Sequence, residues 1–274
     1  MTLTFLLLVL LRAAVAIVVV VGASALAEAA GPFWGGLIVS LPISAGPAYV
    51  MLGLQHDAAF IAAGALASLA ANAVSLLYMF IIIVLAPRLR WPLVLAIGLA
   101  VWFAVAWVVR QVHWDLTGVL LLNLAMLGSL LWLSRSARRI DTVRAKPTPR
   151  RWFELPMRAL MVGTLTASVV TASQWLGPSL TGMAAVFPIA TTGLALVTLP
   201  RLGGRATAAL FASTLVAMPG FAIAVLVLHL TAQPFGVWWG MVTALGAQLV
   251  FAALLLLGHR VPAPRAAAEP EVSA

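Results

Sequence analysis

The chain has 274 residues, of which 64% are hydrophobic and only 8% charged, with a formal net charge of +9 and no cysteine. Soluble domains carry about 25% charged residues, so a chain this apolar has too few polar side chains for a water-facing surface. The lack of cysteine excludes disulfides and thiolate chemistry. We therefore expect an all-α polytopic membrane protein whose basic residues set its topology and contact membrane lipids, with no nucleic-acid partner.

Nine apolar stretches are each long enough to cross most of about 30 Å of hydrocarbon as a helix. The first has no basic flank and is too long for the core of a signal peptide, so we expect it to span the membrane. Short loops favour antiparallel neighbours in one bundle. The expected spans are 3–27, 32–54, 58–86, 92–109, 116–134, 155–174, 177–199, 206–230 and 235–258.

Loop charges predict the orientation of these spans. Segment 135–151 is rich in arginine and contains a single acidic residue, Asp141, so the positive-inside rule makes it cytoplasmic. The basic loops near 88 and 201 then also lie inside, whereas Arg12 and Arg110 are exceptions. We expect a multi-pass protein of the bacterial inner membrane, with its N-terminus outside and its C-terminus inside.

An internal repeat appears at an offset of 146 residues, without a gap. Because an odd number of spans separates the two copies, we expect them to be inverted. The predicted units are a four-helix repeat at 1–110, an inverter helix with the basic loop at 111–153, a second four-helix repeat at 154–260 and a disordered tail at 261–274. The matched pairs are Arg12-Ala13 with Arg158-Ala159, Gly31-Pro32 with Gly177-Pro178, Gly36 with Gly182, and Pro42-Ile43 with Pro188-Ile189.

The second helix of each repeat contains a proline about 15 Å from its start, near the bilayer midplane. Pro42 and Pro188 each remove a backbone N–H and are expected to free a carbonyl four residues back, such as that of Ala184. Interrupted helices at matching positions of inverted repeats are typical of a transporter's midplane site. The alternative is a pair of packing kinks, with Gly36 and Gly182 allowing close helix contact.

Two arginines, Arg12 and Arg158, lie near the start of the first helix of each repeat. They are expected either to extend to the interface or to neutralise an anionic group. The residues expected to bind substrate are Pro42, Ser44, Gly46, Pro188, Thr191, Thr192, Arg12 and Arg158.

Polar residues also mark faces of other spans. Thr164, Ser168 and Thr171 share one helical face, which predicts either bonds between helices or a cavity wall. Asn72, Ser75 and Tyr78 lie on the third span, where Asn72 and Ser75 are one turn apart and are expected to face the bundle interior. Asn123 is expected to join the inverter helix to a neighbour.

Signs of catalytic chemistry are weak. The carboxylates lie near predicted interfaces, and Glu28 is the best candidate for one inside the membrane. The histidines lack metal-ligand spacing, and no nucleophile–base pair is visible. We therefore expect neither an enzyme nor a metal or other cofactor.

The run Gly36-Leu37-Ile38 to Pro42-Ile43, after a first helix with Arg12-Ala13-Ala14, resembles the GlpM family of small four-helix bacterial inner-membrane proteins. Each repeat here is similar to one such unit. The family's name implies a link to glycerol metabolism, and the resemblance implies no specific activity.

The leading hypothesis is a transporter or lipid flippase that moves a small or amphipathic substrate, with an anionic group as one option, between the two interrupted helices. A non-transporting scaffold of a cell-envelope assembly and a narrow channel are the alternatives. Expected partners are membrane lipids, a small-molecule or lipid-like substrate, and either a second copy of the chain or an envelope complex.

Overall fold

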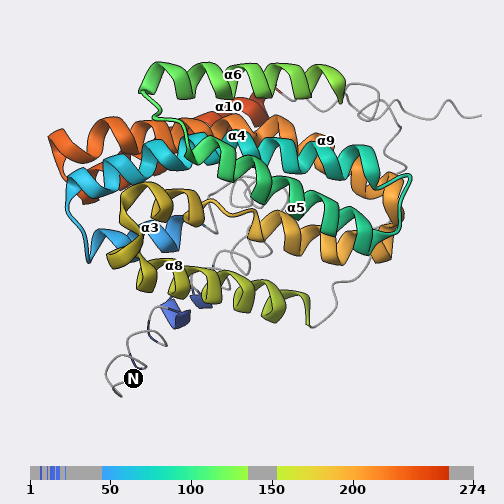
Figure 1. Ribbon diagram of the computed structural model, residues 1–274, viewed down its shortest axis with the longest axis horizontal. Helices are drawn as coiled ribbons and strands as arrows, with labels where there is room; N and C mark the ends of the chain where they lie inside the picture. The colour runs from blue at the N-terminus through green and yellow to red at the C-terminus, as the bar shows by residue number, and fades with distance from the viewer. Residues whose placement is uncertain are drawn as a thin grey trace, which may run out of the picture.

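The fold is described from a computed structural model, which covers residues 45–134 and 153–258 together with scattered positions between 7 and 22. Helices make up these two stretches (Figure 1). Pro42, Ser44, Arg12, Glu28, segment 135–151 and the tail lie outside the described residues. The helices are α3 (Ala45–Gly53), α4 (Ala58–Leu85), α5 (Trp91–Arg110), α6 (Leu116–Leu133), α8 (Glu154–Ala185), α9 (Ile189–Phe235) and α10 (Val237–Gly258).

By length and composition, the described residues contain five helices able to cross a membrane, which makes the chain a helical membrane protein. This differs from the nine spans expected from the sequence. Helices α4, α5 and α6 begin and end within one residue of the expected spans 58–86, 92–109 and 116–134. The difference lies beyond them: the expected spans 3–27 and 32–54 fall largely outside the described residues. The expected spans 155–174, 177–199 and 206–230 fall in one apolar stretch from 159 to 235, which is divided by internal turns.

Turns divide this long stretch at three points. Gly177 (φ 70°) and Gly203 (φ 77°) adopt the left-handed backbone region that favours glycine, and each marks a kink where two helices meet, within α8 and within α9 respectively. Between them, α8 ends at Ala185 and α9 begins at Ile189. Residues 186–188, called the break from here on, therefore separate a half-helix at 178–185 from another at 189–202.

Two aspartates start helices at one end of the bundle. Asp57 caps α4 by accepting from the backbone N–H of Phe60 at 2.8 Å, and Asp115 caps α6 by accepting from that of Gly118 at 2.9 Å. The predicted position of both carboxylates near an interface agrees with this capping role.

Helix α4 lies at the centre of the bundle and packs against α9, α8, α5 and α6 (Figure 1). Its attachment to the outer helix α6 runs through two amides, since Asn72 Nδ2 donates to Asn123 Oδ1 at 2.9 Å. Asn123 in turn donates to the carbonyl of Leu69 at 2.8 Å. The prediction that Asn123 joins its helix to a neighbour is confirmed.

Glycines bring α4 close to the helices on either side of the break. A Cβ on Gly182 would overlap the carbonyl of Gly64, and one on Gly204 would overlap the carbonyl of Ala86. Backbones this close need residues without side chains, as is common between membrane helices. The close contact predicted for Gly182 is confirmed, with Gly64 as its partner.

Loops and tryptophans sort to two ends of the bundle. The α3–α4 loop and the turn at Gly177 lie at one end (left in Figure 1), and the α4–α5 loop and the turn at Gly203 at the other. Exposed tryptophans flank both ends, about 24 Å apart between Trp91 and Trp107 of α5. Such belts are typical of the two membrane interfaces. Among the described residues, the other exposed tryptophans are Trp175, Trp238 and Trp239 at the first end and Trp132 at the second.

Candidate functional site

The break is the candidate site because it interrupts a helix, and its backbone hydrogen bonds, in the middle of an apolar stretch. Pro188 is buried at its end, so the predicted interruption at this proline is confirmed. The carbonyl of Ala184 was expected to be free, and this is wrong: it accepts from the backbone N–H of Phe187 at 3.1 Å. The chain tightens after α8 and satisfies this acceptor locally.

One hydroxyl pair reaches the half-helix before the break. Ser68 of α4 donates to the carbonyl of Gly182 at 2.6 Å, which uses its single proton. The hydroxyl of Tyr49, on α3, lies 2.6 Å from the Ser68 oxygen and must therefore be the donor in that bond. The result is a chain of bonds from an aromatic hydroxyl through serine to a backbone carbonyl, and all three residues are buried.

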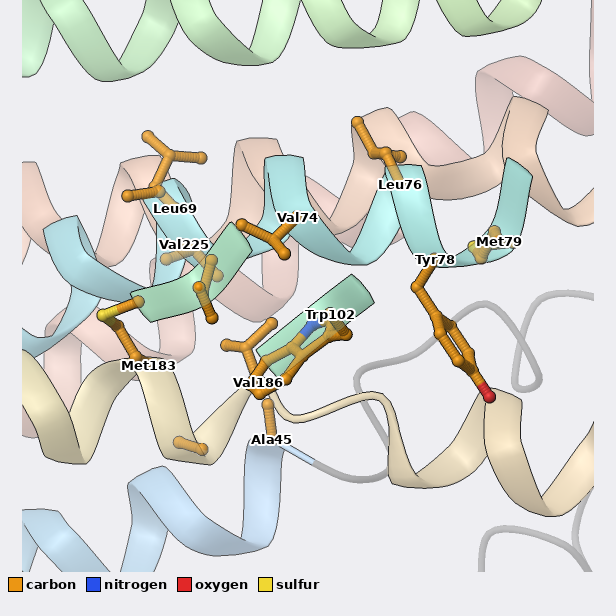
Figure 2. Packing of buried hydrophobic residues seen from close by; sticks show 14 of the residues in the cluster. Ala45, Leu69, Val74, Leu76, Tyr78, Met79, Trp102, Met183, Val186 and Val225 are labelled. Carbon is orange, nitrogen blue, oxygen red and sulfur yellow. The ribbon is translucent and has the colours of Figure 1, made fainter. Parts of the chain in front are cut away.

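A second chain of the same kind reaches the far side of the break. Thr192 donates to the carbonyl of Pro188 at 2.7 Å, so the Tyr78 hydroxyl, 2.8 Å away, donates to Thr192. Figure 2 shows the Tyr78 hydroxyl directed away from α4 toward this half-helix. Thr191 also donates to Pro188, at 3.0 Å, so this carbonyl has two hydroxyl donors.

A third chain reaches the break itself. Trp102 Nε1 of α5 donates to Ser75 Oγ at 3.3 Å, and Ser75 donates to the carbonyl of Val186 at 3.4 Å. Figure 2 shows Trp102 beside Val186. The ring of Phe187 packs edge-on against Trp102, with 5.0 Å between centroids, and lies 5.6 Å from Phe103. Aromatic rings thus cover the bonded carbonyl on the α5 side.

These three chains, called the relays from here on, share one design. Each begins at an aromatic donor, passes through a hydroxyl and ends at a carbonyl of residues 182–188. All of the groups are neutral. In a membrane each such bond contributes about 0.6–1.7 kcal/mol, so the relays hold the break firmly and yet allow exchange. A ligand with hydroxyl, amide or ammonium donors has the chemistry to replace a protein hydroxyl on these carbonyls.

The residues predicted to bind substrate divide into two groups. Pro188, Thr191 and Thr192 lie at the break, and Gly46 is half-buried in α3, which packs against α8. Arg158 belongs to the first turns of α8, and its side chain lies outside what the structure describes, as do Pro42, Ser44 and Arg12. The structure thus brings together the second-repeat part of the predicted site.

The predicted polar face of α8 is placed differently. Thr164 and Ser168 are exposed within the described part of the chain, whereas Thr166 and Ser173 are buried. The face that packs on the bundle is therefore rotated from the one expected. Ser173 bonds to His56 Nε2 at 2.7 Å and so ties α8 to the α3–α4 loop.

Sequence reasoning identified Ser75 as inward-facing, placed Tyr78 on the same span and predicted Thr192 and Pro188 as site residues. It missed the relay members Tyr49, Ser68 and Trp102. A signal existed for Ser68, since it lies seven and ten residues before Ser75 and Tyr78, on the same helical face. Tyr49 and Trp102 belong to other helices, and their spacing along the chain carries no such signal.

The histidine and carboxylate side chains described do not form a group of three or more able to hold a metal ion. Fold and site together define a polytopic helical membrane protein with an interrupted helix bonded to a central helix. Comparison with protein-family models, curated proteins and solved structures finds no match for this chain. The similarity to the GlpM family therefore stays a prediction.

Proposed function

We propose that the chain is a membrane transporter, of the small-molecule or lipid-flippase kind, whose substrate passes along the break. The observation that carries this proposal is the interruption of a helix inside a bundle of apolar spans. Irregular backbone at membrane depth is tolerated only against protein or a water-lined cavity, and transporters use it to bind cargo. The substrate is small or amphipathic, and anionic if Arg12 and Arg158 take part.

The half-helix 178–185 is the element that moves in this mechanism. It is short, and it is bounded by Gly177 on one side and by the break on the other. A Cβ on Gly177 would meet no atom within 4 Å among the described residues, so the turn there has room to change. Among the described residues, the side-chain hydrogen bond between this segment and α4 is the neutral one from Ser68 to Gly182, and the rest of the contact is packing against Gly64 and the apolar core. Opening exchanges this bond for bonds to substrate.

A static scaffold is the second candidate, favoured by a different observation. The carbonyls of Gly182, Val186 and Pro188 all have partners inside the protein, so the break is closed as it stands. A closed break is also what a transporter in one resting state requires. The two candidates therefore differ in movement and not in this geometry. A narrow channel stays a third candidate, to be tested by electrical conductance.

Inverted repeats are part of the proposal, together with the nine-span layout. An offset of 146 carries the start of α4, Ala58, to Gly204, where the chain resumes as a helix after Gly203. It carries Trp91, the start of α5, to Val237, the start of α10. This agreement of boundaries supports duplication of a four-helix unit of the GlpM kind.

A contact near the chain's start also supports duplication. A Cβ on Gly163 would lie 2.8 Å from the side chain of Ile17, and these positions differ by 146. Equivalent residues touch one another where a two-fold axis passes between two copies. An axis between the first helices of the repeats is what an inverted pair requires.

The loops that lie together at each end of the bundle support an orientation with the N-terminus outside and the C-terminus inside, in a bacterial inner membrane. The loop at 86–90 touches the turn at Gly203, and both were assigned to the inside by charge. His56 and Ser173, which bond to each other, each lie one span away from a loop assigned to the inside, so the same topology places both outside. The paired ends fit a single topology.

Movement at the break is tested with single cysteines, because the natural chain contains none. Thr192→Cys places a thiol at a buried position of the break, and we expect a maleimide to label it in membrane vesicles at a measurable rate. Ala212→Cys, buried in the second part of α9, is the matched control and should stay unlabelled. Val112→Cys, at an exposed position in the α5–α6 loop, gives the labelling rate of a fully accessible thiol, which is the upper limit for comparison.

Labelling of Thr192→Cys no faster than that of Ala212→Cys would reject transport through the break and favour the scaffold. As a second test, Pro188→Ala should slow the labelling of Thr192→Cys by straightening the helix. An unchanged rate would show that the proline interruption does not govern opening.

A further inference from the structure

Four arginines gather at the end of the bundle where the α4–α5 loop meets the turn at Gly203. Arg88 and Arg90 come from the loop, and Arg201 and Arg205 flank the turn. These four residues are called the arginine end. Figure 1 shows the α4–α5 loop and the turn in α9 at the same end of the bundle. The two segments are far apart in sequence, so the fold itself brings the charges together.

The contact between the two segments is close enough for the side chains to share a ligand. A Cβ on Gly204 would overlap the carbonyl of Ala86 and lie 3.0 Å from the nitrogen of Pro87. Arg205 and Arg88 are each one residue further along the chain, so their Cα atoms lie at most about 14 Å apart. Two arginine side chains, each about 6 Å long, span this separation with one phosphate between them.

The two aspartates that the structure describes lie away from Arg88, Arg90 and Arg205. Asp57 and Asp115 cap α4 and α6 at the opposite end. Arg88 donates to the carbonyl of Val84 and so helps to end α4, while Arg90 and Arg205 are exposed. Like charges held at this range favour an external anion.

The position of the arginine end relative to the membrane interface indicates which kind of anion it binds. Exposed Trp91 follows Arg90 directly and marks the membrane interface at this end. Beyond it, α5 presents exposed apolar residues such as Leu93 and Ile97, which suit acyl chains. A molecule that meets arginines at headgroup level and apolar side chains one turn deeper is a phospholipid with an anionic headgroup.

We propose that the arginine end is a binding site for the headgroup of an anionic phospholipid, held by Arg88, Arg90 and Arg205 through bonds to phosphate. The apolar start of α5 packs against the acyl chains. The site is separate from the break and does not depend on transport, because it lies at the end of the bundle and uses charged groups that the relays lack.

The test is the lipid retained by the detergent-purified full chain, measured by native mass spectrometry with phosphatidylglycerol or phosphatidylcholine added. We expect retention of phosphatidylglycerol over phosphatidylcholine. The triple variant R88Q/R90Q/R205Q should lower apparent affinity for phosphatidylglycerol about tenfold or more. The matched control R110Q, an arginine at the opposite end, should leave it unchanged.

A second variant guards against altered topology, since loop arginines also orient the chain. R88K/R90K/R205K keeps every positive charge and loses the paired N–H geometry of guanidinium, so it should insert normally and bind phosphatidylglycerol at an intermediate level. Equal binding by the wild type and both triple variants would overturn the proposal. So would an equal loss in R110Q, or displacement of the lipid by inorganic phosphate, which would indicate a soluble anion as the ligand.

Discussion

Helices α4 and α6 are both long and apolar, yet they belong to opposite parts of the molecule. In the most apolar stretch of α4, 72% of residues are buried, compared with 17% in α6. The buried face of α4 bears Ser68, Asn72, Ser75 and Tyr78, and each bonds to another helix. Helix α6 has one such residue, Asn123. The difference teaches that polar side chains, and not hydrophobicity, identify the central helix of this bundle.

The largest expected difference in stability between the close contact of α4 with α8 and the loosely packed α6 comes from replacing a glycine in each. Gly182→Ala places a methyl group on the carbonyl of Gly64, backbone against backbone, where no side chain can move aside. We expect a loss of about 3 kcal/mol in stability, or failure to fold. Gly128→Ala in α6 meets no atom within 4 Å among the described residues and should be neutral or stabilising by up to about 1 kcal/mol.

The measurement is the midpoint of thermal unfolding of both variants in the same detergent. Similar midpoints for Gly182→Ala and Gly128→Ala would mean that α4 and α8 do not pack this closely.

The attachment of α6 is a smaller effect. Asn123→Ala leaves the amide of Asn72 without its partner in the bundle, and we expect a loss of about 1–2 kcal/mol. Ser129→Ala is the control, because the Ser129 hydroxyl bonds only to carbonyls of its own helix. Unfolding in a denaturing detergent measures both variants. A cost no greater than that of the control would show that packing alone holds α6.

The smallest expected effect concerns pH at the α3–α4 loop. Burial lowers the pKa of His56, and the neighbouring Asp57 partly opposes this. Because the folded protein then binds a proton less readily than the unfolded chain, stability should be constant at higher pH and fall as pH drops through about 6.5. The thermal midpoint of wild type should decrease slightly on acidification in that range, and that of His56→Gln should decrease less. If the thermal midpoints of wild type and His56→Gln fell equally with decreasing pH, His56 would not be the cause of the pH dependence.

Much of the fold was predictable where single residues dominate. Helices α4, α5 and α6 follow from uninterrupted apolar stretches, and the break coincides with Pro188, whose missing N–H favours a helix end. Proline alone does not decide this, since Pro219 lies inside α9. The turns at Gly177 and Gly203 lie at the boundaries of the expected spans 155–174, 177–199 and 206–230, so their positions were predictable. Their left-handed backbone was not predicted, because glycine permits several conformations and packing selects among them.

The site was predictable only in part, for a related reason. Thr191, Thr192 and Pro188 stand out by their distance from a helix start. The relays join three helices through Tyr49 and Trp102, and such contacts depend on packing that spacing does not encode. The inward face of α8 was misjudged because hydroxyl residues occur on both of its sides, with Thr164 exposed and Thr166 buried.

Hydrogen exchange of the full chain in lipid nanodiscs tests the central claim, that the break is the mobile polar region of an otherwise fixed bundle. The comparison is between backbone amides of 186–192 and those of 70–76 in the middle of α4, both inside the bundle. The account predicts clear exchange at the break while the α4 amides stay protected, because opening replaces the relays with bonds to water or substrate. Equal protection of the two segments would contradict it and leave the chain a static scaffold.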